Sequence, residues 1–346
     1  MSQAASGTGI SDRLERLPFS RFHRNFLLMV TAGEFVETMM LLGNGVILAM
    51  IATVLHFSPT ISTYVIPVSF FAGEFVGSIV LGYLADQLGR RTVFAFDLLI
   101  FGAGMIIAAF WSNPILIAIF VFVAGVGVGG EFPLVDTYTT EVFPGLQRGR
   151  RMATVYTLAV IAAPVVAVLA YVLSHPKPGP FSWRILFWII GVLALIVWFV
   201  RLRLPESPRW LEVRGRDAEA ERGIADMEER AKQEHGLQEL PPLPERLHVP
   251  ERPARWLDIW APDLRGRTVM MLVFQFFQSG IFYGFTALAP TFLLHKGISL
   301  VHTLLFTMII YSGYLVGSIF NIFIIDRVER KWGIVVTAIL AGVLGT

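Results

Sequence analysis

Six carboxylates stand inside stretches of sequence that are otherwise apolar, and these residues could carry chemistry. They are Glu34, Glu37, Glu74, Asp97, Glu131 and Asp136. A carboxylate in an apolar interior is costly unless it finds a partner, faces a water-filled cavity or takes up a proton. A group that takes up and releases a proton between two sides of a barrier can couple proton movement to another process. The pattern therefore indicates proton handling inside apolar elements.

The elements that must position these acids are membrane-spanning helices. Hydrophobic residues make up 55% of the 346 residues and charged residues only 16%, which is more apolar surface than a soluble protein of this length can bury. A helix needs about 20 apolar residues to cross the hydrocarbon core. We expect spans at 26–55, 61–84, 93–110, 115–142, 152–173, 183–202, 268–294 and 301–325, and a ninth that opens at 333. The ninth covers only about 21 Å before Thr346, so we expect the sequence to break off inside a helix.

The distribution of Lys and Arg predicts the orientation of the spans. Segments on one side hold 25 of the 28 basic residues, and segments on the other side hold three. Basic residues concentrate on the cytoplasmic side of membrane proteins. We therefore expect a cytoplasmic N-terminus, a cytoplasmic segment at 203–267 and no basic residue inside a span. The expected location is a bacterial cytoplasmic (inner) membrane, with the protein as a monomer in the lipid bilayer.

The sequence disfavours several other functions. The chain has no cysteine, no pair of histidines at metal-ligand spacing within one helix and no phosphate-binding loop. The glycine run at 125–130 lies in an apolar stretch, where close helix packing is its expected role. No nucleophile and base are paired, so we expect no enzyme activity, no cofactor and no metal. The basic residues indicate topology rather than nucleic-acid binding.

The long segment between the sixth and seventh spans has two parts. Residues 208–235 are rich in Glu, Arg and Ala, and Glu228 and Lys232 have the spacing of a solvated surface helix. A proline-rich stretch at 241–253 predicts an extended linker, and Trp256 to Trp260 suit an interfacial helix. We expect a tether between two bundles, with a partner-binding or regulatory site as the alternative.

Four short motifs lie at span ends on the side that we expect to be cytoplasmic. They are Gly82-x-x-x-Asp86-x-x-Gly89-Arg90-Arg91, Glu141-x-x-Pro144-x-x-x-Arg148-Gly149-Arg150, Pro205-Glu206-Ser207-Pro208-Arg209 and Asp326-Arg327-x-Glu329-Arg330. With the span pattern, they resemble the major facilitator superfamily, in particular its sugar-porter and metabolite:proton symporter branches.

This resemblance implies an all-α integral membrane fold of two pseudo-symmetric six-helix bundles. The chain would divide into a cytoplasmic lead-in at 1–25, an N-terminal bundle at 26–203, a cytoplasmic inter-bundle loop at 204–266 and a partial C-terminal bundle at 267–346. The second bundle would be truncated after about span nine.

The resemblance also implies that charged residues at the span ends form a cytoplasmic gate. Exposed ion pairs contribute only about 0–1 kcal/mol each, so a network of them can open and close reversibly. Simple anchoring of the topology is the alternative. The gate candidates are Gly82, Asp86, Gly89, Arg90, Arg91, Glu141, Arg148, Arg150, Glu206, Arg209, Asp326 and Arg330.

By the same resemblance, spans one, four and seven line a central cavity for substrate and proton. This favours Glu37 and Glu131 over Glu74, whereas Asp97 and Asp136 are expected to join the gate. Acids that are satisfied by hydroxyl or backbone groups are the alternative. The candidates for proton or substrate contact are Glu37, Glu131, Glu34, Glu74, Gln275, Gln278 and Tyr283.

The sequence departs from the family pattern at three places. Val121 stands where relatives often carry an arginine that pairs with a cavity acid, Phe276 and Phe277 replace the paired glutamines of sugar porters, and Ile322 replaces a glycine. We expect a secondary active transporter that moves a small organic metabolite, with carboxylates among the classes to consider, together with protons. A sugar transporter, a drug or product exporter and a non-transporting membrane sensor remain as alternatives.

Overall fold

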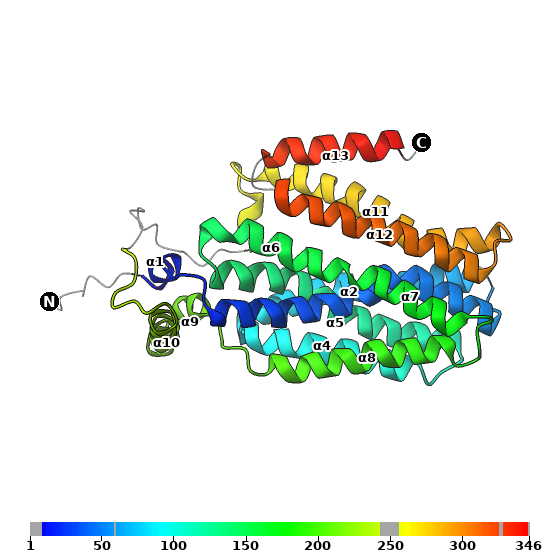
Figure 1. The fold of residues 1–346 in the computed structure, drawn as a ribbon, viewed down its shortest axis with the longest axis horizontal. Helices are drawn as coiled ribbons and strands as arrows, with labels where there is room; N and C mark the ends of the chain where they lie inside the picture. The colour runs from blue at the N-terminus through cyan, green and yellow to red at the C-terminus, as the bar shows by residue number, and fades with distance from the viewer. Residues whose placement is uncertain (1–8, 59, 243–255, 325–327, 345–346) are drawn as a thin grey trace.

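The computed structural model describes residues 9–58, 60–242, 256–324 and 328–344, and within these residues it contains helices and no strands (Figure 1). Three of the α-helices, α1 (Ile10–Glu15), α9 (Pro208–Val213) and α10 (Asp217–His235), lie together at one end of the molecule. The others are α2 (Arg21–Leu55), α3 (Ile66–Leu88), α4 (Arg90–Ala108), α5 (Pro114–Val142), α6 (Gly145–Val160), α7 (Ala162–Ser174), α8 (Ser182–Arg201), α11 (Arg265–His295), α12 (Leu300–Ile324) and α13 (Arg330–Leu344).

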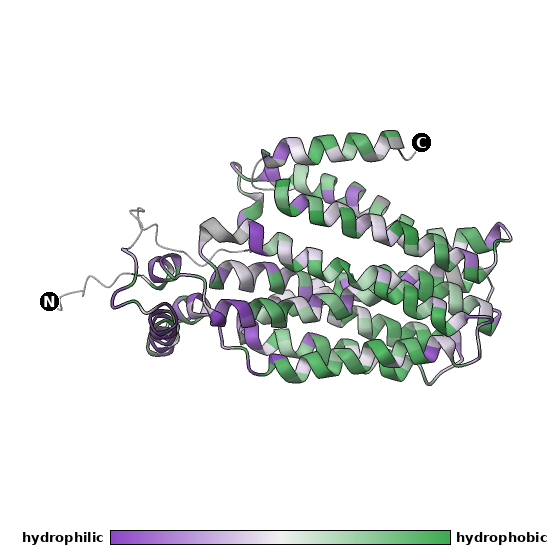
Figure 2. Ribbon diagram, in the orientation of Figure 1, coloured by the Kyte–Doolittle hydropathy of each residue, from purple (hydrophilic) through white to green (hydrophobic). Residues whose placement is uncertain are grey.

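Eight helical stretches of the described chain are long and apolar enough to cross a membrane, and they match the first eight predicted spans. The fifth is a single stretch, Gly149–Ser174, although it is divided into α6 and α7. Pro164 explains the division, because it lacks the N–H that would bond to Val160. Apolar residues cover the long helices, whereas polar residues gather at α1, α9 and α10 (Figure 2).

Glycines let α5 approach α3 very closely. A Cβ at Gly125 or Gly129 would collide with backbone carbonyls of α3, and a Cβ at Gly73 or Gly77 would collide with backbone carbonyls of α5. Because the clashing atoms belong to the backbone, a side chain could not be accommodated by a change of rotamer. The predicted packing role of the 125–130 glycine run is therefore confirmed.

The helices of the second half pack most closely on the first half at one end. The buried residues of α12 all lie between Leu300 and Tyr311, and the Tyr311 hydroxyl donates to the Leu42 carbonyl of α2. By contrast, five successive residues of α11, from Val269 to Val273, are all exposed, and successive helical residues cover the whole circumference. The two halves therefore stand apart toward the end that carries α9 and α10.

One polar contact joins the halves near the middle of the bundle. The Thr157 hydroxyl of α6 lies 2.7 Å from the Ser318 hydroxyl of α12, and 3.2 Å from the Ser318 carbonyl. A hydroxyl pair of this kind contributes about 0.5–1.5 kcal/mol. It can be exchanged for water at small cost when the halves move.

Helix α1 docks on α9 and α10. Leu14 packs with Trp210 and Ile224 in a small apolar cluster, and Glu228 accepts hydrogen bonds from Arg13 and Arg16, each at 2.6 Å. Glu228 is only 8% exposed. The prediction of a solvated surface helix is therefore wrong for the face of α10 that carries Glu228, because α1 covers it.

The pH dependence of this docking follows from Glu228. Burial opposes its charged form, but the hydrogen bonds from Arg13 and Arg16 outweigh burial and lower the pKa of Glu228 below its ordinary value. A lowered pKa gives stabilisation that is present above the ordinary pKa and is lost as the pH falls through the lowered one. We expect α1 to stay docked at neutral pH and to be released only below about pH 4, as measured by hydrogen exchange of its amides.

A matched pair of variants checks the same contact at neutral pH. Glu228→Gln is expected to speed tryptic cleavage in α1, whereas Glu229→Gln changes an exposed neighbour and is expected to leave cleavage unchanged. Equal cleavage of the two variants would show that the charge of Glu228 does not hold α1 in place.

Candidate functional site

The first motif forms a tight corner between α3 and α4. Gly89 joins the two helices with φ at +103°, a conformation that residues with a side chain rarely adopt. The Glu206 carboxylate accepts hydrogen bonds from the backbone N–H groups of Arg90, at 2.9 Å, and Arg91, at 3.2 Å. These N–H groups belong to the first turn of α4 and have no acceptor within the helix itself. Glu206 therefore caps α4 from a position more than 100 residues away in the sequence.

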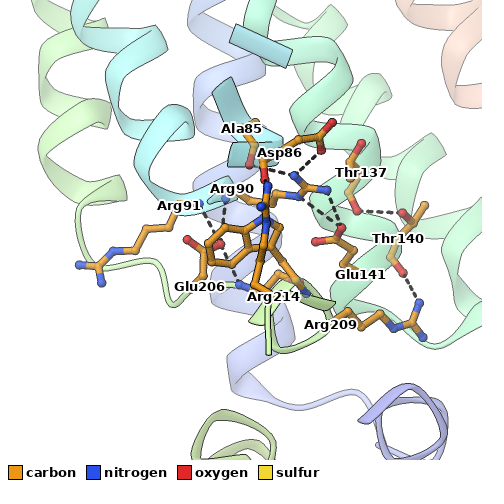
Figure 3. Close-up of polar contacts among 12 residues, drawn as sticks. Ala85, Asp86, Arg90, Arg91, Thr137, Thr140, Glu141, Glu206, Arg209 and Arg214 are labelled. Atoms are coloured by element: carbon orange, nitrogen blue, oxygen red, sulfur yellow. Dashed lines mark hydrogen bonds and ion pairs between the residues drawn. The ribbon is translucent and has the colours of Figure 1, made fainter. Parts of the chain in front are cut away.

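The Arg90 side chain connects three elements of this corner (Figure 3). Its Nη1 lies 2.7 Å from Asp86 of α3, and its Nη2 lies 3.2 Å from Glu141 at the end of α5. Trp210 of α9 donates to the Asp86 carbonyl at 3.0 Å, and Arg214 donates to the same oxygen. The corner is therefore tied to both α5 and α9.

Two further arginines contact backbone carbonyls rather than the acids of the motif. Arg91 donates to the Leu202 carbonyl at 2.9 Å, and Arg209 donates to the Thr140 carbonyl at 3.2 Å. Burial raises the pKa of Glu206, although the N–H groups of Ser207, Arg91 and Arg90 oppose this shift. Glu206 is thus a helix cap more than an ion-pair partner.

The remaining gate candidates are placed differently. A Cβ at Gly82 would meet no atom within 4 Å, and Arg150 is exposed. Asp326 and the side chains of Arg148 and Arg330 lie outside the described residues. Within the described residues, the hydrogen bonds and ion pairs of the corner join α3, α4, α5, the segment from α8 to α9 and, through Arg209 and Glu15, α1. These contacts among the described residues do not reach α11 or α12.

A matched glycine pair tests the corner. Gly89→Ala is expected to strain the backbone by about 1–3 kcal/mol and to displace Glu206, because the new Cβ would collide with its carboxylate. Gly82→Ala is expected to be almost silent, since it meets open space. Thermal unfolding of the two purified variants measures the difference. Equal melting temperatures would contradict the role of Glu206 as the cap of α4 beside Gly89.

A second charged centre lies inside the bundle around Arg201, the last residue of α8. Its guanidinium forms a bidentate pair with Glu131 of α5, in which Nη1 lies 2.7 Å from Oε2 and Nη2 contacts Oε1. Asp97 of α4 lies 3.7 Å away, and all three side chains are 0% exposed. The centre is a buried ionic triad.

Backbone groups complete the surroundings of Arg201. Its Nε donates to the Met29 carbonyl at 3.3 Å, Nη2 donates to the Val30 carbonyl at 3.3 Å and Nη1 donates to the Phe94 carbonyl at 3.4 Å. With Glu131, these acceptors satisfy all five guanidinium N–H donors. A Cβ at Gly33 would collide with the guanidinium, so glycine leaves the space that the arginine fills.

Arg201 corrects the expectation that no basic residue enters a span. The sequence places Arg201 at the end of an apolar run, where a count of loop charges assigns it to the cytoplasmic segment. In the structure its long side chain turns back into the bundle and supplies the cation that Val121 does not. Val121 itself is buried in the apolar core. The sequence did hold a signal for this buried ion pair: an arginine stands next to the last residue of a predicted span, and neighbouring spans carry acids.

Other acids of the bundle lack such partners. Both carboxylate oxygens of Glu37, one oxygen of Glu34 and one oxygen of Glu74 have no hydrogen-bond partner among the described residues. Glu34 and Glu37 are each 1% exposed. Asp136 accepts from Tyr156 at 2.9 Å and does not join the corner at Gly89, and neither does Asp97.

The predicted residues of the second half are divided between interface and surface. The Tyr283 ring of α11 packs against Phe71 of α3, with 5.9 Å between centroids, so Tyr283 lies where the two halves meet. Glu34 and Glu74 are within electrostatic reach of Tyr283. Gln275 and Gln278 are exposed. Of the three candidates, only Tyr283 is brought near the acids.

Comparisons with known proteins agree with this architecture. The niacin transporter NiaP of Acinetobacter baylyi is 28% identical over 337 residues, which cover 96% of this chain and 72% of NiaP. The inner membrane metabolite transport protein YdjE of Escherichia coli is 28% identical over 346 residues, which cover 97% of this chain and 74% of YdjE.

Solved structures show the same fold. The xylose transporter XylE from E. coli, in a partially occluded inward open conformation, matches with a TM-score of 0.67 at 18% identity, over 89% of this chain and 74% of XylE. The model of the Major Facilitator Superfamily matches residues 30–346. The chain is a membrane transport protein and belongs to the major facilitator superfamily.

Proposed function

We propose that the protein moves a small organic metabolite together with protons and that Glu37 carries the proton. The contrast between Glu37 and Glu131 supports this most directly. Glu131 has a guanidinium on both oxygens, whereas neither oxygen of the buried Glu37 has a hydrogen-bond partner among the described residues. A carboxylate without a counter-ion is costly in such a place, so Glu37 holds a proton in this conformation.

The charges around Glu37 give a reason for coupling. Glu34, Asp97 and Glu131 lie within electrostatic reach of Glu37, and Arg201 is the cation among these groups. Since Glu131 occupies Arg201, an anionic substrate beside Glu37 would be repelled unless Glu37 were protonated. Substrate and proton would then bind together, which is the condition for symport.

The relatives support a metabolite as the cargo. NiaP is named a niacin transporter and YdjE a metabolite transport protein, and niacin is a pyridine carboxylic acid. A small carboxylic acid is therefore the first substrate class to test. A solved neighbour is named a D-xylose-proton symporter, which supports proton coupling and keeps sugars as the second class.

The separation of the halves supports an inward-facing conformation. Helices α11 and α12 stand apart from the first half toward the α9–α10 end, and the excess of basic residues assigns this end to the cytoplasm. In this arrangement the corner at Gly89 braces the first half while the halves rock, and its ion pairs can rearrange at little cost. The expected location remains a bacterial inner membrane.

Uptake into proteoliposomes tests the proposal. Vesicles with an alkaline interior are supplied with a panel of labelled carboxylic acids, including niacin, and with sugars. We expect accumulation of a carboxylic acid that is abolished by a protonophore. Accumulation of a sugar would replace the substrate class, uptake that is insensitive to the protonophore would contradict proton coupling, and movement of no solute in either direction would favour a sensor.

A further inference from the structure

Two adjoining cavities lie between α2, α8 and α10. The larger has a volume of about 660 Å³ and lies between the first turns of α2, the segment that follows α8 and one face of α10. The smaller has a volume of about 260 Å³ and lies between α2 and α8. Both are lined by Asn25 and Met29. They therefore adjoin each other at Asn25 and Met29, with the larger cavity on the side of α10 and the smaller one between α2 and α8.

The larger cavity has one unbalanced positive charge. Asp226 pairs with Arg230 at 2.9 Å, and Glu234 accepts from the Arg21 backbone N–H at 2.6 Å and lies 3.8 Å from the Arg21 side chain. The exposed side chain of Arg203 has no ion pair with the described residues. One monovalent anion would balance this charge.

The smaller cavity is apolar and opens to the outside of the bundle. Apart from Asn25, its lining consists of Leu28, Met29, Ala32, Ile196, Val197 and Val200. Leu28 is 58% exposed and Ile196 is 54% exposed. Both belong to helices that are long and apolar enough to cross a membrane. Such a groove faces the hydrocarbon of the bilayer, where an acyl chain can fill it.

We propose that the two cavities bind one anionic phospholipid, with its phosphodiester at Arg203 beneath α10 and an acyl chain in the groove between α2 and α8. A phosphodiester carries a single negative charge, and guanidinium groups bind phosphate through paired hydrogen bonds. The acids of the cavity are already paired with Arg21 and Arg230, so a headgroup ammonium has no free partner. This favours phosphatidylglycerol over phosphatidylcholine.

Native mass spectrometry of the purified protein with defined lipids tests the proposal without any transport measurement. We expect phosphatidylglycerol to be retained in preference to phosphatidylcholine. Arg203→Gln is expected to weaken retention about five-fold, the factor that corresponds to the about 1 kcal/mol contributed by one interfacial basic residue. Arg222→Gln removes an equal charge from an exposed position of α10 outside the cavity and is expected to have no effect.

A second variant separates the acyl chain from the headgroup. Ala32→Trp fills the groove without a change of charge and is expected to reduce retention of phosphatidylglycerol. Glycerophosphoglycerol, which has the same singly charged phosphodiester headgroup but no acyl chain, is expected not to displace the lipid. Equal retention of the two lipids, equal effects of Arg203→Gln and Arg222→Gln, or displacement by glycerophosphoglycerol would overturn the proposal. These outcomes are independent of which solute is transported.

Discussion

Replacing Arg201 with methionine is expected to destabilise the protein by about 3–5 kcal/mol, because removal of one member of a buried ion pair leaves the other charge without compensation. The uncompensated groups would be Glu131 and Asp97, which are 0% exposed. The carbonyls of Met29, Val30 and Phe94 would also lose a donor. Thermal unfolding in detergent measures the loss.

The double variant distinguishes charge from packing. Arg201→Met combined with Glu131→Gln removes both charges of the bidentate pair, so it is expected to be more stable than Arg201→Met alone. Arg184→Met, at the other end of α8 and partly exposed, is the control and is expected to have a much smaller effect. A single Arg201 variant that melts like the unmodified protein would contradict the stabilising role of the buried triad.

Glu37→Gln is expected to abolish accumulation of substrate against its gradient and to preserve exchange of substrate across the membrane. Glutamine has nearly the shape of a protonated glutamic acid but cannot release a proton. With a gradient of one pH unit, a symporter that moves one proton per substrate accumulates about ten-fold, since one pH unit corresponds to about 1.4 kcal/mol. The variant should reach only equal concentrations, as measured by uptake and by counterflow in proteoliposomes.

Matched acids make this experiment specific. Asp136→Asn changes an acid that already has a hydrogen-bond partner in Tyr156 and is expected to leave accumulation intact. Glu131→Gln is expected to lower stability through Arg201 in addition to any effect on transport. If Glu37→Gln accumulated substrate at the normal level, another acid would have to carry the proton. Glu34 would be the next candidate, because one of its oxygens also has no hydrogen-bond partner in the described chain.

The helices were predictable because length and apolar content suffice to define a span. The break between α6 and α7 was harder to place, because its position depends on the single missing N–H of Pro164. The start of α2 at Arg21 instead of residue 26 also depends on local bonding, since Ser20 and His23 form a reciprocal cap there. Hydropathy thus predicts where a helix lies in the sequence, whereas local hydrogen bonds decide the residue at which it begins or ends.

The charged partners were less predictable, because they join distant positions in the sequence. The sequence groups Asp86 and Arg90 in one motif, but nothing in the sequence indicates that Glu206 caps α4. Arg201 was assigned to a loop because hydropathy describes where a backbone lies and not where a long side chain reaches. The pairing of Arg201 with Glu131 requires α4 to pack against both α5 and α8, which only the fold supplies.

The contact between Tyr311 and Leu42 has a mechanical consequence. From Tyr311 to Ile324 the helix extends for about 20 Å, at about 1.5 Å per residue. If this contact acts as a fulcrum, a rotation of ~15° shifts the distal tip of α12 by about 5 Å. A small rotation at this contact therefore produces a displacement at the far end of α12 that is as wide as a small solute. Because the chain has no cysteine, single thiols introduced along α12 would report this lever motion against a silent background.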